Sequence, residues 1–184
     1  MLCLIGTTSS CATQTSPSEQ PVEYSSADAF FNIASKVVSG TNQGIDPHDL
    51  FHWWASVNIP ENKRNHYMIC GCAYIYGGSW GISWEDIQQQ FNHKMLNGVK
   101  HDWLSLYMER YNFGESMEKH LLITQYINAK IIEKVTKEQG YAAAMELLHS
   151  GDMRKHRKEF FEVLNRVTGI NEQNFNEKIT GYLN

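Results

Sequence analysis

Net charge is low in this chain, and long apolar runs are missing. Lys and Arg together number 16 and Asp and Glu 20, which gives a net charge of −4 and a pI near 6.0. This balance provides no electrostatic reason to bind nucleic acid, which needs a basic surface. No apolar run approaches the roughly 20 residues that cross a bilayer as a helix. The sequence therefore predicts neither a nucleic-acid partner nor a membrane-spanning segment.

Cysteine is also scarce, with four residues at Cys3, Cys11, Cys70 and Cys72. Their spacing gives neither a disulfide framework nor the paired C-x-x-C of a zinc ribbon. Cys70 and Cys72 are too close in sequence to bridge each other within a helix, so both are predicted to be free thiols. In an exported protein, such unpaired thiols indicate either burial or a role as a metal ligand.

The N-terminal segment, residues 1–24, differs in composition from the rest of the chain. It begins "MLCLIGTTSSC" and continues with Ser, Thr, Gln and Pro. The segment resembles the end of a bacterial lipoprotein signal with Cys11 as the acylated residue, although a basic start is missing and Thr8 stands where leucine is usual. The resemblance implies export to the bacterial cell envelope, with membrane contact only through a lipid anchor at Cys11. The alternatives are a leader without function and a cytoplasmic protein.

Residues 25–184 are predicted to form one mainly α-helical domain with little or no β-sheet. The 42% hydrophobic and 12% aromatic content is enough for a core. Apolar residues recur at helical spacing, alternating strand patterns are weak, and Asp46-Pro47 and Ser83 have the positions of helix starts. The segment 66–76 is short and apolar and fits either a helix or a strand. Helices are expected over residues 26–40, 46–57, 83–96, 100–111, 117–140, 141–151, 157–169 and 171–184.

The stretch "GIDPHDLFHWWAS" places His48 and His52 four residues apart, with Asp49 directly after the first histidine. Positions i and i+4 share one face of a helix, so the two imidazoles can be directed at one ion. Zinc in proteins is held by nitrogen, sulfur and oxygen donors in a tetrahedron. In H-E-x-x-H sequences the residue after the first histidine activates a metal-bound water.

The motif "HDLFH" resembles the H-E-x-x-H of the gluzincin, or thermolysin-like, zinc metallopeptidases, with Asp49 in place of glutamate. The later stretch "CGCAYIYGGSWG" resembles their E-G-x-A-x-x-x-G-G pattern, with Cys70 at the position of the third zinc ligand. The resemblance covers residues 44–184 and implies a multi-helix domain like the helical half of a zincin, without the upstream sheet. It implies zinc (Zn) held by His48, His52 and Cys70, with Asp49 as general base. Tyr126 is then the match to a tyrosine that stabilises an oxyanion.

Each of these residues also has a structural explanation, which for His48 and His52 is a partly exposed histidine and a core histidine. Asp49 lies in the first turn after Asp46, where an acid interacts favourably with the helix N-terminus, and its side chain is one methylene shorter than that of glutamate. Cys70 lies in an apolar segment where buried, inert cysteines are common, and Tyr126 lies on the apolar stripe of a long helix. The six other histidines, at positions 66, 93, 101, 120, 149 and 156, are predicted to be on the surface.

Three hypotheses follow from this sequence. The preferred one is a catalytically degenerate gluzincin-like domain with a binding or vestigial role, for which a peptide or protein partner is expected. The second is a working or weak zinc peptidase that uses His48, His52 and Cys70 as ligands and Asp49 as base. The third is an unrelated helical lipoprotein or interaction domain in which the motif is a coincidence.

Overall fold

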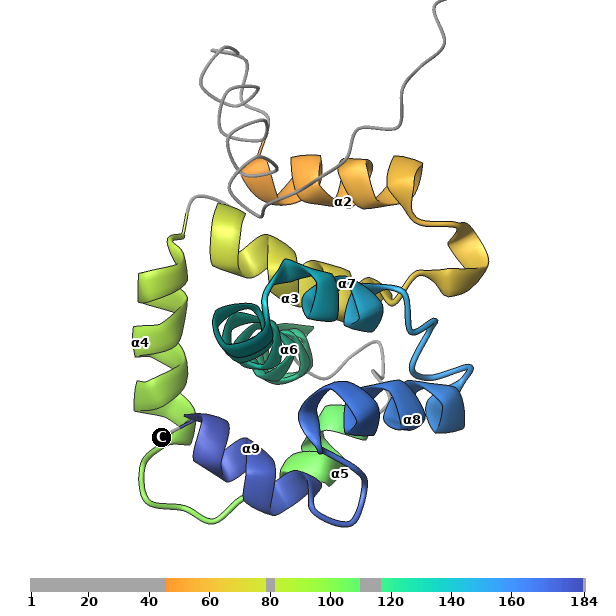
Figure 1. Cartoon of the computed structure of the whole chain (residues 1–184). Coiled ribbons are helices and arrows are strands. Elements are labelled where there is room, and N and C mark those ends of the chain that lie inside the picture. Colours follow the sequence, from red (N-terminus) through yellow and green to blue (C-terminus); the bar gives the residue numbers. More distant parts are fainter. Residues whose placement is uncertain (1–45, 79–81, 110–116, 184) are drawn as a thin grey trace, which may run out of the picture.

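The described part of the chain is all-helical. The computed structural model describes residues 46–78, 82–109 and 117–183, with the side chains of 117–122 left out. Within these ranges there is no β-sheet, and the elements are eight α-helices and a short 3₁₀ helix. They are α2 (Pro47–Asn58), η1 (Glu61–Lys63), α3 (His66–Gly77), α4 (Trp84–Met95), α5 (Trp103–Met108), α6 (Met117–Gln139), α7 (Tyr141–Leu148), α8 (Arg157–Thr168) and α9 (Phe175–Leu183), as drawn in Figure 1.

The mainly α-helical class predicted from the sequence is confirmed for these residues. The finer expectation, that the domain is the helical half of a zincin, stays a prediction. The expected helix over 26–40 and the lipid-anchor cysteine at position 11 lie outside the described residues. None of the helices that the structure describes is both long and apolar enough to span a membrane.

Capping side chains define where α2 and α4 begin. Asp46 precedes Pro47 and accepts a hydrogen bond from the backbone N–H of His48, as the sequence predicts for a helix start. Ser83 Oγ accepts from the backbone N–H of Asp86, which caps the helix, and its hydroxyl donates to the Asp86 carboxylate. Both starts are therefore determined by residues that are neighbours in sequence.

Helix limits differ from the sequence expectation at several places, and the helix expected to run to residue 151 ends at Leu148. The helix expected to run to residue 111 ends at Met108. The helix expected to run to residue 96 ends at Met95, before Gly98. The last helix starts at Phe175 rather than near Asn171, because Asn171 accepts hydrogen bonds from the backbone N–H groups of Gln173 and Asn174 and so closes a separate turn.

Helix α6 is the centre of the fold, and Figure 1 shows it surrounded by α3, α4, α5, α7 and α9. It crosses α3 at Gly71, where a Cβ atom would lie 2.7 Å from the backbone nitrogen of Ala129. This contact requires glycine, because any side chain would separate the two helices.

Segment 66–76, which fits a helix or a strand from its sequence, is helix α3. Six consecutive residues, Met68 to Ala73, are buried. Helix α2 covers one side of α3 and α6 covers another, as Figure 1 shows. A helix buried on several sides loses the periodic pattern of polar and apolar residues, which explains why periodicity did not identify it.

Candidate metal centre

The N-terminus of α2 lies directly against the C-terminus of α3. A Cβ atom added to Gly77 would lie 2.5 Å from the backbone nitrogen of His48 and 2.8 Å from the carbonyl carbon of Pro47. The next residue, Gly78, has φ +64°, a value that glycine adopts readily, and it ends α3. The glycine pair therefore allows the chain to turn while its backbone contacts the first turn of α2.

This contact positions His48. Its Nδ1 atom lies 2.9 Å from the carbonyl oxygen of Gly78. A carbonyl only accepts, so Nδ1 carries the proton and the lone pair of the neutral ring is on Nε2. The ring also packs edge-on against Tyr74, with 4.9 Å between the ring centroids. The orientation and the tautomer of His48 are thus determined by α3.

Three potential metal ligands converge at this position. His48 and His52 contribute imidazole nitrogens from α2, and Cys70 contributes a thiol from α3. The Nε2 atoms of the two histidines are 3.1 Å apart, and Cys70 Sγ lies 3.5 Å from His48 Nε2. All three donor atoms lie within 4.8 Å of one another. The two histidines and the cysteine selected from the sequence are therefore brought together by the fold.

The ionisation of two of these groups is shifted by their surroundings. Burial, assisted by the neighbouring His48, lowers the pKa of His52 to about 4, although the Asp49 carboxylate acts in the opposite direction. Burial raises the pKa of the Cys70 thiol to about 12. At neutral pH, His52 is therefore an uncharged imidazole and Cys70 a protonated thiol that must lose its proton to bind a metal.

Asp49 and Tyr126 lie in different settings. Asp49 is exposed in the first turn of α2, where its charge acts on His52. Tyr126 is 3% exposed in the core between α4 and α6, where its ring stacks on Phe91 at a centroid distance of 3.7 Å. Burial, and then the charge of Glu133, raise the pKa of the Tyr126 hydroxyl to about 12. This position matches the structural explanation of Tyr126, and its catalytic role stays a prediction.

The second cysteine of α3 provides an internal comparison. Cys72 is a free thiol like Cys70, as predicted, and it is 1% exposed in the apolar core. It lies outside the group formed by His48, His52 and Cys70. Two residues correspond to about 200° around a helix, so neighbouring cysteines of one helix face different surroundings.

Sequence reasoning missed two contributors to this centre, the Gly78 carbonyl and the Tyr74 ring. Gly78 belonged to the glycine pattern of the family resemblance, and a backbone carbonyl leaves no residue-type signal. Tyr74 lies four residues after Cys70 and so on the same face of α3. That spacing could have identified Tyr74 as a neighbour of the ligands.

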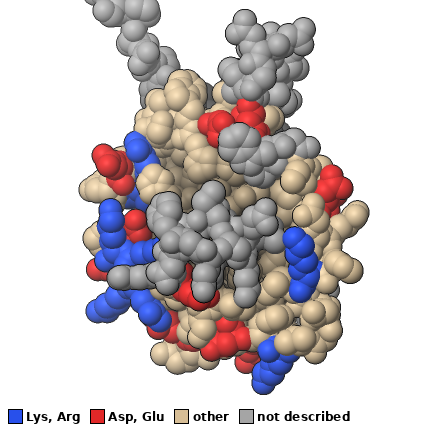
Figure 2. Space-filling model, turned by 180° about the vertical axis from the view of Figure 1, so that it is seen from behind, with Lys and Arg blue, Asp and Glu red and all other residues tan. Residues whose placement is uncertain are grey.

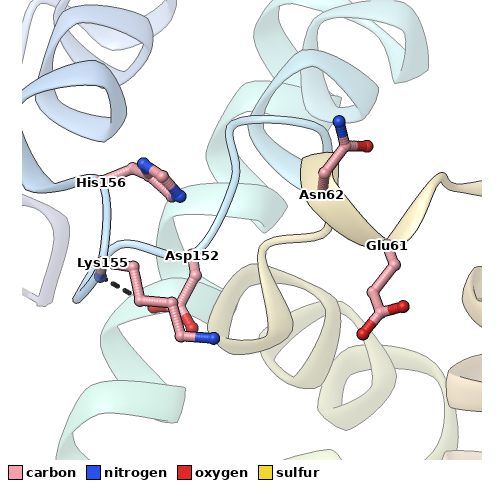
Figure 3. Close-up of a pocket in the computed structure, with 5 residues that line it drawn as sticks. All are labelled: Glu61, Asn62, Asp152, Lys155 and His156. Carbon is pink, nitrogen blue, oxygen red and sulfur yellow. Dashed lines mark hydrogen bonds between the residues drawn. The ribbon is translucent and has the colours of Figure 1, made fainter.

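A polar cavity of about 430 Å³ lies elsewhere, where η1 meets the turn that precedes α8 (Figure 3). The Asp152 carboxylate at its edge accepts hydrogen bonds from the backbone N–H groups of Arg154 and Lys155. Asp152 therefore stabilises the turn that leads into α8. The cavity combines charges of both signs and is lined by Glu61, Asn62, Asp152, Lys155 and His156.

Charged residues of both signs occur on the face of the molecule shown in Figure 2, with red and blue residues side by side at several places. This distribution agrees with the small net charge of the chain.

Comparison of the chain with protein-family models, curated proteins and solved structures finds no match. The case for a function therefore rests on the chemistry and the geometry of the metal centre.

Proposed function

We propose that this domain binds one zinc ion between α2 and α3, through His48, His52 and Cys70. The spacing of the donors carries this proposal. Zinc–nitrogen and zinc–sulfur bonds of about 2.0–2.1 Å and 2.3 Å give a tetrahedron with edges of about 3.3 Å between nitrogens and about 3.6 Å between nitrogen and sulfur. The separations from His48 Nε2 are 3.1 Å to His52 Nε2 and 3.5 Å to Cys70 Sγ, and all three donor atoms lie within 4.8 Å of one another.

The types of donor favour zinc over the common hard cations. Two imidazoles and a thiolate suit a borderline-soft ion, whereas magnesium and calcium prefer sets of oxygen ligands. The hydrogen bond between His48 Nδ1 and the Gly78 carbonyl is the kind of outer-shell contact that metal-binding histidines usually make. The donor types support zinc, and the contact with the Gly78 carbonyl supports a His48 ring that is oriented before the ion arrives.

The role that we propose is binding without peptide hydrolysis, in a degenerate gluzincin-like domain. Asp49 is one methylene shorter than the glutamate of H-E-x-x-H, and a general base must come within about 2.6–3.2 Å of the proton that it removes. The described residues contain no β-sheet whose edge could hold an extended substrate. Exposed Trp53 and Val57 on α2 offer apolar surface near His52 for the peptide or protein partner that this proposal includes.

Zinc titration of the protein tests the binding proposal. Protein purified without chelator should contain zinc, and after chelation it should take up one equivalent, as measured by calorimetry and elemental analysis. A His52→Ala variant should lose this binding, whereas the control His149→Ala, on a histidine outside the group of ligands, should retain it. Equal zinc content in all three proteins would remove the site.

The second candidate function is weak zinc-dependent peptide hydrolysis, and the observation that favours it is the effect of the Asp49 charge on His52. An Asp49→Glu variant restores the reach of the base and separates the two functions. We expect neither the natural protein nor this variant, each loaded with zinc, to cleave a peptide library above the rate of the His52→Ala variant. Cleavage by Asp49→Glu alone would show that only the reach of the base was lost.

A further inference from the structure

The proposed zinc site has three protein ligands, which leaves the fourth corner of the tetrahedron to be assigned. An open corner holds water in catalytic zinc sites, whereas structural sites have four protein ligands. The identity of the fourth ligand therefore decides what the site can do. We propose that the imidazole of His66 closes the shell, which would make this a structural zinc centre; this inference rests on the proposed function.

The register of α3 places His66 next to the site. His66 and Cys70 are four residues apart on α3, as His48 and His52 are on α2. Residues at this spacing lie on the same face, and the side chain of the later residue leans towards the earlier one. The face of α3 that presents the Cys70 thiol to His48 therefore also carries His66. The two helices together present one pair of donors each.

The packing of α2 on α3 supports this proximity. Cys70, one turn after His66 on the same face of α3, has its Sγ atom 3.5 Å from Nε2 of His48. The donor atoms of His66 are outside the group separated by less than 4.8 Å, so the side chain must change its rotamer to reach the ion.

The backbone at His66 is anchored while its side chain has freedom to turn. The preceding residue, Asn65, is fully buried, and its backbone N–H donates to the Leu148 carbonyl oxygen at 2.9 Å. The Asn65 amide also donates to the Ser150 hydroxyl. His66 itself is exposed, and no hydrogen bond to another described residue holds its imidazole. The first turn of α3 is therefore held in place while its first side chain remains available.

Asp49, directly after His48, is an alternative protein ligand, and its position on α2 is less suitable. It follows His48 by one residue, which corresponds to about 100° around the helix, away from the face that His48 and His52 share. A fourth protein donor would give the ion the number of protein ligands that structural zinc sites have. The register of the two helices favours His66 over Asp49 for this position.

Metal spectroscopy on the full chain tests this assignment. The protein is loaded with zinc for X-ray absorption, and with cobalt(II) for its ligand-field spectrum. The natural protein should show three imidazoles and one sulfur around a tetrahedral ion. The variant His66→Ala should show two imidazoles, one sulfur and one oxygen from water, with zinc affinity reduced about 100-fold.

The control is His93→Ala, which removes an exposed histidine from α4 and should change neither the spectrum nor the affinity. An unchanged shell and unchanged affinity in His66→Ala would overturn the assignment and leave the three-ligand site standing. If the natural protein takes up no zinc, the proposed function fails as well. Circular dichroism of the variants checks that each keeps the helix content of the natural protein.

Discussion

The close approach of α2 and α3 at Gly77 makes the sharpest prediction about how the metal centre is built. In a Gly77→Ala variant, the new Cβ atom would lie 2.5 Å from the His48 backbone nitrogen and 2.8 Å from the Pro47 carbonyl carbon. Both atoms belong to backbone, so rotation of a side chain cannot relieve the overlap. The start of α2 must move away from α3.

The magnitude of this effect follows from comparable overpacking. Inserting a methyl group into a tightly packed contact costs about 1–3 kcal/mol. For a domain of this size, each kcal/mol lowers the Tm by roughly 2–4 °C. The movement also separates His48 Nδ1 from the Gly78 carbonyl, and loss of an outer-shell partner reduces metal affinity by about 10–100-fold. Gly77→Ala should therefore lose both stability and zinc affinity.

A matched control is available in α9. A Cβ atom at Gly181 has open space around it, so Gly181→Ala should be neutral or stabilise the helix by about 0.5–1 kcal/mol. Thermal unfolding without metal, followed by zinc titration, compares the two variants with the natural protein. If Gly77→Ala is as stable as Gly181→Ala and binds zinc as tightly as the natural protein, the described packing of α2 on α3 is incorrect.

Two further predictions concern the core and the pH dependence of binding. Tyr107→Phe removes the hydroxyl that donates to the buried Asn128 side chain, so that amide is left without a partner. The loss should lower the free energy of unfolding in urea by about 1–3 kcal/mol. An unchanged midpoint of urea unfolding would contradict the buried contact. Because the pKa of Cys70 is raised to about 12 and that of His52 is lowered to about 4, zinc should displace one thiol proton between pH 7 and 8.5. Zinc affinity should then rise about tenfold per pH unit, and a flat profile would exclude the thiol as a ligand.

The sequence predicted the parts of this structure that depend on near neighbours in the chain. The start of α2 at Asp46 and Pro47 follows from capping rules, and the reciprocal contact of Ser83 and Asp86 follows from their spacing. The shared face of His48 and His52 follows from the period of the helix. Local geometry is sufficient in each of these cases.

The parts that depend on tertiary packing were harder to predict. Segment 66–76 could not be assigned to a helix by periodicity, because it is buried on more than one side. Cys70 was selected through a family resemblance, since nothing local to it indicates that its thiol would lie 3.5 Å from His48. The role of Gly78 depends on a backbone carbonyl reaching a side chain 30 residues away, which a sequence pattern does not encode.

The two buried cysteines of α3 provide the most direct test of the central claim, that α2 and α3 together bind zinc. Cys70→Ala and Cys72→Ala make the same chemical change in the same helix, but only the first removes a donor from the group. The measurement is the zinc dissociation constant of each variant at one pH. We predict that Cys70→Ala weakens binding by at least about 100-fold and that Cys72→Ala leaves it unchanged. Equal affinities in the two variants would contradict the proposed centre.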